Sequence, residues 1–264
     1  MTSIYPLPQD TQQRFADTNR QCSNLSLLLD RYIGYKSEPQ LWQFQEEQKF
    51  QFFKEISHQF KFPPGLIEHY YTRWLAMARA LPHAQTFTAS PEWRMVVGLG
   101  QSSILETSMT LDRVTGIPII PGSALKGLAA SYAMLCVIEE TKRASAENNP
   151  KFKAIFGSQG EAGRVIFLDA VPTKVPFLET DIMNNHYQDY YNGKSAPTPD
   201  RNPIPVYFLT LGRKSQFAFA VAGRDAFPET QALVEQASEW LQAGLSELGI
   251  GAKTAAGYGY MEIK

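Results

Sequence analysis

The sequence ELGIGAKTAAGYGYMEI, residues 247–263, is the most informative stretch of this chain, because its four glycines form two G-x-G pairs separated by five residues. Glycine lacks a Cβ atom, so it adopts positive φ values freely and lets another backbone approach closely. A loop so rich in glycine loses much conformational entropy on folding, which contact with a ligand offsets. Successive backbone N–H groups in such a loop form a concavity that binds anions. The spacing therefore predicts a phosphate-binding loop, with Lys253 as its positive charge.

Two structural explanations of these glycines compete with ligand binding. Gly249 follows the last apolar residue of a helical pattern, which is typical of a helix C-cap. The second glycine pair is also compatible with a bulge in a strand. A Walker A loop is excluded, because that motif needs adjacent Gly and Lys and opens a helix. Here Ala252 separates Gly251 from Lys253, and a strand is predicted to follow.

The composition indicates a globular protein with a substantial core, since 44% of the 264 residues are hydrophobic. The net charge of −1 does not indicate a nucleic-acid binder, so RNA binding would need a local basic surface or a partner that supplies charge. Cys22 and Cys136 lie far apart and indicate neither a zinc ribbon nor a disulfide framework. The polar N-terminus and the lack of a bilayer-length apolar stretch predict a cytoplasmic protein that does not contact a membrane.

Upstream of the glycine stretch, Pro228 opens a predicted helix that ends at Gly249. Strands are predicted at residues 93–99, 104–111, 164–170, 206–211, 217–222 and 258–263. Residues 206–211 and 217–222 flank a Gly-Arg-Lys-Ser turn and are interpreted as a β-hairpin. A short helix is expected at 152–156.

A second motif, IIPGSALKG at residues 119–127, predicts the start of another helix. Ser123 is the expected N-cap. Lys126 falls in the first turn, where the helix dipole disfavours a cation, so the lysine either faces an anion docked at the helix N-terminus or is simply solvated.

Two helices are predicted near the N-terminus, at residues 38–60 and 66–81, from apolar residues at helical spacing. Residues 171–205 contain six prolines and no clear periodicity. A stretch of this length without regular structure is usually functional or disordered in a compact domain.

From residue 90 onward the predicted order is β-α-β-β-α-β with insertions, which is an α+β, ferredoxin-like arrangement. Residues 1–85 are expected to form a helical extension packed on this core, and residues 86–264 to form the core domain. Many readers of single-stranded RNA use this arrangement. The fold alone does not establish a function.

Four segments together resemble the RAMP superfamily of CRISPR-associated proteins, and within it a subunit of the Cmr (type III-B) effector complex. They are residues 119–127, 163–172, 181–191 and 249–259. The resemblance implies a backbone subunit that caps a helical filament, holds CRISPR guide RNA, captures complementary target RNA and contacts other Cmr subunits in antiviral defence. It also implies a thumb-like insertion at about residues 172–203. The RNA-binding residues that it implies are Gly122, Ser123, Lys126, Gly249, Gly251, Lys253, Thr254, Gly257 and Gly259.

The chemistry agrees with this resemblance, because a backbone subunit must hold RNA whatever the guide sequence. Such a protein should contact phosphates and 2′-hydroxyls rather than base edges. Backbone amides and a few lysines suffice for one short stretch of RNA.

Catalytic hypotheses are weaker. Asp181, His186 and Asp189 could form a metal or acid–base set, but their spacing does not place them on one helical face. Some RAMP relatives are metal-independent endoribonucleases that use a histidine as general acid or base, and the histidines here are His58, His69, His83 and His186.

Asp112 precedes the helix-start motif in a region comparable to that of the aspartate in target-cleaving subunits, but a turn role explains it better. The sequence therefore predicts a non-enzymatic RNA-binding protein without a metal or cofactor. The alternatives are a RAMP endoribonuclease, with His186 or Asp112 as the residue to test, and a nucleotide-binding regulatory domain.

Overall fold

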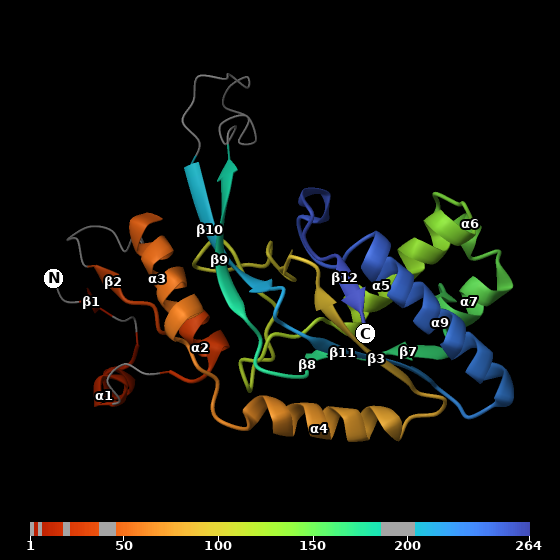
Figure 1. The fold of residues 1–264 in the computed structure, drawn as a ribbon, viewed down its shortest axis with the longest axis horizontal. Coiled ribbons are helices and arrows are strands. Elements are labelled where there is room, and N and C mark those ends of the chain that lie inside the picture. The colour runs from red at the N-terminus through yellow and green to blue at the C-terminus, as the bar shows by residue number, and fades with distance from the viewer. Residues whose placement is uncertain (1–2, 5–6, 18–21, 37–45, 186–203) are drawn as a thin grey trace, which may run out of the picture.

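The computed structural model describes residues 3–4, 7–17, 22–36, 46–185 and 204–264. Within these residues the chain is of the α+β class, with helices packed on antiparallel sheets. A five-stranded and a three-stranded sheet occupy the centre of the molecule (Figure 1). No helix of the described part of the chain is long and apolar enough to cross a bilayer.

The five-stranded sheet has the order β12-β3-β11-β7, with β8 also paired to β11. Every pair in it is antiparallel. Its strands are β3 (Gln85–Pro91), β7 (Val165–Phe167), β8 (Val171–Pro172), β11 (Phe217–Gly223) and β12 (Met261–Ile263). All seven residues of β11 are buried, so this strand lies inside the protein on both of its faces.

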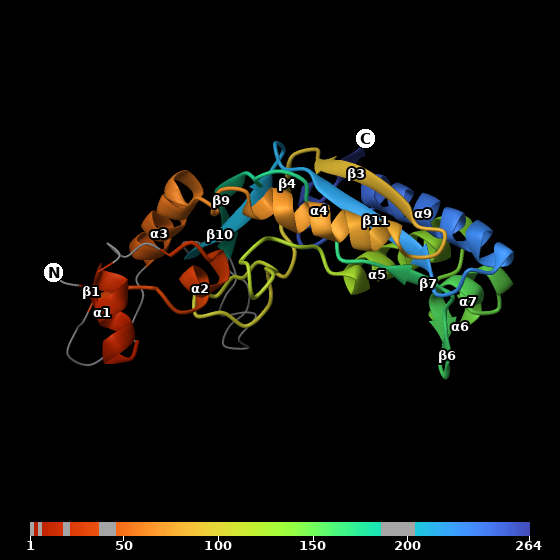
Figure 2. The ribbon, with the colours of Figure 1, turned by 90° about the horizontal axis from the view of Figure 1, so that it is seen from below.

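The two faces of β11 differ in side-chain size, because successive residues of a strand point to opposite sides. The larger residues, Phe217, Phe219 and Val221, join the main hydrophobic core with α5 (Gly122–Tyr132) and α9 (Pro228–Glu247). The alanines on the other face lie against Trp74 and Ala78 of α4 (Leu66–Arg79). Small residues let α4 approach the sheet closely, and Figure 2 shows this helix lying across it.

The three-stranded sheet has the order β4-β10-β9 and is also antiparallel. Its strands are β4 (Arg94–Met95), β9 (Leu178–Asn185) and β10 (Ile204–Gly212). α3 (Glu46–Gln59) packs against β9 and β10. The two long strands continue as a ribbon away from the rest of the molecule, and Ile204 pairs with Asn185 at its outer end (Figure 1).

The remaining elements flank these sheets. They are β1 (Ser3–Ile4), α1 (Gln9–Asp17), α2 (Leu25–Asp30), β2 (Tyr35–Lys36), a π-helix (Ala133–Val137), α6 (Arg143–Ala146), α7 (Pro150–Phe156), β5 (Gly157–Ser158), β6 (Glu161–Ala162) and a 3-10 turn (Thr254–Ala256). Leu25 of α2 and Phe53 of α3 belong to the same buried cluster as Leu241 of α9. α2 and α3 therefore share one core with the sheets.

Several predicted elements are confirmed. α9 lies where the sequence placed it, and so does α7, which ends at Gly157 with φ +80; β12 forms only the second half of the strand predicted at 258–263. The predicted helix at 66–81 is α4. The predicted helix at 38–60 is described from residue 46 onward as α3, and its first residues lie outside the described part of the chain.

The predicted hairpin is wrong. β10 and β11 follow one another in the chain but pair with different strands, β10 with β4 and β9, and β11 with β3, β7 and β8. β10 finds its partner in β9, an eight-residue strand inside the stretch that was interpreted as irregular. β11 instead lies in the interior of the larger sheet, between β3 and β7, and is buried on both of its faces.

Three further predictions need correction. The strand at 93–99 is limited to β4, and β3, which pairs with β11 and β12, was not predicted. The strand at 104–111 is absent from the described structure except for a single bridge between Leu111 and Pro118. The N-cap of α5 is not Ser123, because the helix already includes Gly122 and Pro121 precedes it.

Candidate nucleic-acid interface

The glycine loop is built from residues with positive φ. Gly249, Gly251, Gly257 and Gly259 have φ values of +75, +93, +87 and +78. Packing requires two of these glycines: a Cβ atom on Gly251 would lie 2.3 Å from the carbonyl oxygen of Val96, and one on Gly259 would lie 2.0 Å from that of Ile250. Close backbone contacts within the protein therefore explain why both positions are glycine.

Backbone hydrogen bonds attach this loop to β4 and to itself. The amide of Ala252 donates to the carbonyl of Val96 at 2.9 Å, and that of Gly259 donates to the carbonyl of Arg94 at 2.8 Å. The amide of Ile250 donates to the carbonyl of Gly259 at 2.9 Å, which closes the loop. The loop is thus a fixed structure that joins the C-terminus of α9 to the three-stranded sheet.

The tip of the loop has the geometry of an anion-binding nest. Lys253 adopts the left-handed conformation, with φ 64 and ψ 29, and the right-handed 3-10 turn follows it. A left-handed residue followed by a right-handed one points successive N–H groups into one concavity. Within the described residues, the amides of Lys253, Thr254 and Ala255 donate to no backbone carbonyl. Beside them Gly257 is exposed, and a Cβ atom there would have no atom within 4 Å.

Aromatic rings lie beneath the nest. The Lys253 Nζ atom is 5.2 Å from the ring centroid of Phe208 and 5.8 Å from that of Tyr258. Both rings are buried, and with Val96 they form a small hydrophobic cluster. Among the described residues, no carboxylate lies within ion-pair distance of Lys253. Its charge is therefore available to a phosphate.

A polar network holds the loop on the β9–β10 ribbon. Arg94 Nε lies 2.6 Å from Glu179 Oε2, and Arg94 Nη1 lies 2.5 Å from Asp181 Oδ2. The Tyr258 hydroxyl donates to the same oxygen of Asp181. Burial and this hydrogen bond raise the pKa of Tyr258 to about 12. Asp181 is thus engaged by Arg94 and Tyr258, and its predicted companions His186 and Asp189 lie outside the described residues.

The start of α5, the other predicted contact region, is occupied by the protein itself. The Gly122 amide donates to Asp169 Oδ1 at 2.7 Å. A Cβ atom on Gly122 would lie 2.1 Å from the carbonyl oxygen of Phe167. A carboxylate of the protein therefore caps this helix, and Gly122 is required by contact with β7. Ser123 lies exposed beside it in the first turn.

Lys126 belongs to a patch of positive charge. Burial lowers the pKa of Lys126, and the neighbouring Arg143 and Arg224 lower it further. Arg143 also pairs with Glu147 at 3.2 Å, and Arg224 donates to the carbonyl of Gly163 at 2.8 Å. The helix start thus combines the Asp169 carboxylate with three cations.

The predicted site residues form two groups. Gly122, Ser123 and Lys126 lie against β7 of the five-stranded sheet. The residues from 249 to 259 lie against β4, in the three-stranded sheet. The sequence did not indicate Arg94 or Asp169, because the partners of these side chains lie 85 and 47 residues away in the chain.

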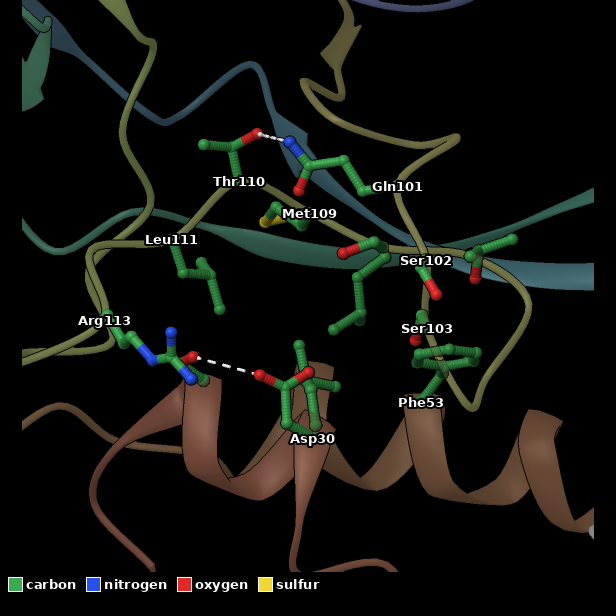
Figure 3. Close-up of a pocket in the computed structure, with 14 residues that line it drawn as sticks. Asp30, Phe53, Gln101, Ser102, Ser103, Met109, Thr110, Leu111 and Arg113 are labelled. Carbon is green, nitrogen blue, oxygen red and sulfur yellow. Dashed lines mark hydrogen bonds between the residues drawn. The ribbon is translucent and has the colours of Figure 1, made fainter.

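A hydroxyl-rich cavity of about 280 Å³ lies elsewhere, between the N-terminal helices and the segment around residues 101–113 (Figure 3). Asp30, Phe53 and Arg113 line it together with several serines and threonines. The run SSILETSMT at residues 102–110 supplies most of these hydroxyls and was the available sequence signal.

The described residues that were considered as catalytic candidates do not form a catalytic group. Asp112 Oδ1 accepts hydrogen bonds from the amide and the hydroxyl of Thr115, at 2.7 and 2.6 Å, so Asp112 stabilises a turn. His83 Nε2 is buried without a hydrogen-bond partner in the described structure. In the part of the chain that the structure describes, no group of three or more His, Cys, Asp or Glu residues could hold a metal ion.

Comparison with known proteins places this chain in a family. Residues 92–262 match the RAMP superfamily. The chain is 34% identical over 250 residues to the CRISPR system Cmr subunit Cmr6 of Pyrococcus furiosus, covering 74% of this chain and 72% of that protein. The chain belongs to the RAMP superfamily, in the Cmr6 family.

A second Cmr6 relative and a solved structure extend this similarity. The CRISPR system CMR subunit Cmr6 of Saccharolobus solfataricus is 25% identical over 228 residues, covering 83% of this chain and 73% of the relative. A chain from the cryo-EM structure of the type III-B Cmr-beta bound to cognate target RNA matches with a TM-score of 0.64 and 21% identity. That match covers 97% of this chain and 86% of the other, and shows that the two share a fold.

Proposed function

We propose that this chain is a non-catalytic RNA-binding subunit of a type III-B CRISPR effector ribonucleoprotein. In this proposal it caps the backbone of the complex, holds guide RNA for capture of complementary target RNA, and contacts other Cmr subunits in the cytoplasm. The observation that carries the proposal is the nest at residues 253–255, whose Lys253 has no carboxylate partner among the described residues, in a member of the Cmr6 family.

The chemistry of the nest suits this role. Backbone amides and one ammonium group bind a phosphate irrespective of the base that it carries. A guide-holding subunit needs this property, since the guide sequence differs from one complex to the next. A protein with a net charge of −1 can still bind RNA if its cations are gathered where the RNA lies.

The proposed residues fall into direct and supporting roles. Lys253, Thr254 and Gly257 would contact the RNA, the first two through the nest and the third by allowing close approach. Gly249, Gly251 and Gly259 would shape the loop. At the second patch Lys126 and Ser123 would face the RNA, while Gly122 lets α5 approach β7.

The domain arrangement belongs to the same proposal. Taken in chain order, β3, α5, β7, β11, α9 and β12 give β-α-β-β-α-β, and the strand order β12-β3-β11-β7 supports a ferredoxin-like core. We assign residues 86–264 to this RNA-binding domain and residues 1–85 to a helical extension. The ribbon of β9 and β10 supports the assignment of residues 172–203 to a thumb-like insertion.

Retention rather than cleavage of RNA is supported by how the carboxylates are used. Asp112 stabilises its own turn, and Asp181 is held by Arg94 and Tyr258. Among the described residues, neither aspartate is hydrogen-bonded to a histidine. An endoribonuclease would instead require one of these groups to be released toward RNA.

The test is to co-express the chain with the neighbouring CRISPR locus, purify through this subunit and sequence the RNA that accompanies it. We expect repeat-derived guides of defined length together with partner proteins. Recovery of the protein alone, with added CRISPR RNA cut at one position, would contradict the proposal and establish a processing enzyme.

A further inference from the structure

We infer that Trp93 is a stacking platform for an unpaired RNA base whose phosphate lies in the neighbouring nest. This inference rests on the proposed function and specifies the form of RNA that the loop takes. It starts from exposure: Trp93 is 48% exposed, whereas the other described tryptophans, Trp74 and Trp240, are 8% and 6% exposed. An indole is a large apolar surface to leave in water, and proteins that bind single-stranded RNA use such rings to stack bases.

The indole of Trp93 is held rigidly from below. The Arg94 guanidinium carbon lies 5.0 Å from the ring centroid of Trp93. Arg94 is itself held in place by its ion pairs with Glu179 and Asp181. The Tyr258 ring contacts the indole at 5.0 Å and an angle of 57°. A ring already fixed by its neighbours loses little conformational entropy when a base stacks on it.

The same tyrosine connects Trp93 to the nest. The Lys253 Nζ atom lies 5.8 Å from the centroid of the Tyr258 ring, which also carries the contact with Trp93. Trp93 and Lys253 therefore flank one side chain. This is the arrangement expected for a site that holds the phosphate and the base of one or two adjacent nucleotides.

The backbone fixes the position of Trp93 relative to the loop. The Glu92 amide donates to the carbonyl of Tyr260 at 2.9 Å, and the Gly259 amide donates to the carbonyl of Arg94 at 2.8 Å. Trp93 lies between these two hydrogen bonds, in the short bend from β3 to β4. The platform and the nest thus belong to one hydrogen-bonded unit.

The occupant that suits this site is single-stranded RNA. A base inside a duplex has both faces covered by its neighbours, so it cannot lie on the indole. Stacking tolerates every base, since each has a π face, which agrees with a guide-independent contact. A neighbouring protein subunit is the competing occupant of an exposed tryptophan, and the experiment separates the two.

The experiment measures binding of a short fluorescent RNA to the full chain at low salt, alongside a matched RNA in which abasic sites replace the bases. Trp93→Ala should weaken binding of the base-bearing RNA about tenfold and leave binding of the abasic RNA unchanged. Trp93→Phe should restore most of the loss. Lys253→Ala should weaken both RNAs alike, because its contact is with phosphate.

Phe227 provides the matched control. It is 63% exposed and lies under the Arg164 guanidinium at 5.8 Å, so it is another exposed ring capped by an arginine, but it is at the start of α9. Phe227→Ala should bind both RNAs as the wild type does.

Each remaining outcome decides one claim. If the wild type binds RNA and Trp93→Ala binds it equally well, the platform is wrong while the nest stands. If Trp93→Ala retains RNA but no longer co-purifies with the other subunits, Trp93 belongs to a protein interface and the inference is overturned. If the wild-type chain binds neither RNA, the proposed phosphate-binding loop itself fails.

Discussion

The glycine loop and the start of α5 look alike in sequence, since each combines glycines with a lysine, yet the structure uses them differently. At α5 the Gly122 amide is already bonded to the Asp169 carboxylate. At the loop tip the amides of residues 253–255 donate to no described backbone carbonyl. The helix start is a closed site with cations around it, whereas the loop is an open site with a cation in it.

The difference shows that a glycine in a binding motif need not touch the ligand. Gly122, Gly251 and Gly259 each lie where an added Cβ would collide with a carbonyl oxygen of the same chain. Gly257 alone of the loop glycines has open space where its Cβ would be. Gly122, Gly251 and Gly259 are therefore explained by packing within the fold, and the ligand explanation is strongest for Gly257.

The largest expected effect tests this distinction through stability. Gly259→Ala should lower the free energy of unfolding by about 3 kcal/mol, because it combines a left-handed φ with a collision at the Ile250 carbonyl. Chemical denaturation measures the loss. The control is Gly127→Ala, in the interior of α5 with no atom within 4 Å of its Cβ position. This substitution should raise the free energy of unfolding by about 0.5–1 kcal/mol. Equal stability of the two variants would contradict the packing explanation.

A smaller loss is expected where the loop meets the ribbon. Arg94→Gln should lower the free energy of unfolding by about 2 kcal/mol, because it leaves two partly buried carboxylates, Glu179 and Asp181, without their cation. Lys153→Gln removes a single exposed pair with Glu161 and should cost far less, because solvent screens an exposed ion pair. If the two substitutions cost the same, the network does not hold the loop in place.

How much of this the sequence predicted depends on the range of the contact. α9, its end at Gly249 and the strand that follows were predicted because local patterns determine them. The assignment of β10 and β11 to separate sheets was missed, since it depends on the pairing of β10 with β9. Likewise the loop was predicted from its glycines, but the roles of individual glycines required the positions of the Val96, Ile250 and Phe167 carbonyls.

Lys253 and Lys126 are expected to contribute differently to RNA binding. Lys253→Ala should reduce the slope of log affinity against log salt by about 0.7, as expected for one phosphate contact with a single strand. Lys126→Ala should change the slope less, because Arg143 and Arg224 keep the helix start positive. Titration of RNA binding at several salt concentrations measures both slopes. A larger change for Lys126 would make the helix start the main contact.

The smallest effect concerns the start of α9, where Asp225 plays the part that Asp169 plays at α5. Hydrogen bonds from Arg164 and Thr230 lower the pKa of Asp225 to about 2 from an ordinary value of 3.8. A lowered pKa stabilises the folded state above the ordinary value, and this contribution is lost as the pH falls through the folded value.

Asp225→Asn should therefore be less stable than the wild type by a constant amount above about pH 4, and the difference should vanish toward pH 2. Thermal unfolding across this range measures it. A difference that persisted unchanged at pH 2 would mean that the charge of Asp225 is not involved.

The central claim is that the glycine loop lies on RNA in the assembled complex. Its most direct test is photocrosslinking of the complex with guide RNA that contains 4-thiouridine, followed by mass spectrometry of the crosslinked peptides. We expect crosslinks to residues 249–259 and to Trp93. Crosslinks confined to other surfaces, such as the cavity beside Arg113, with none in the loop, would contradict it.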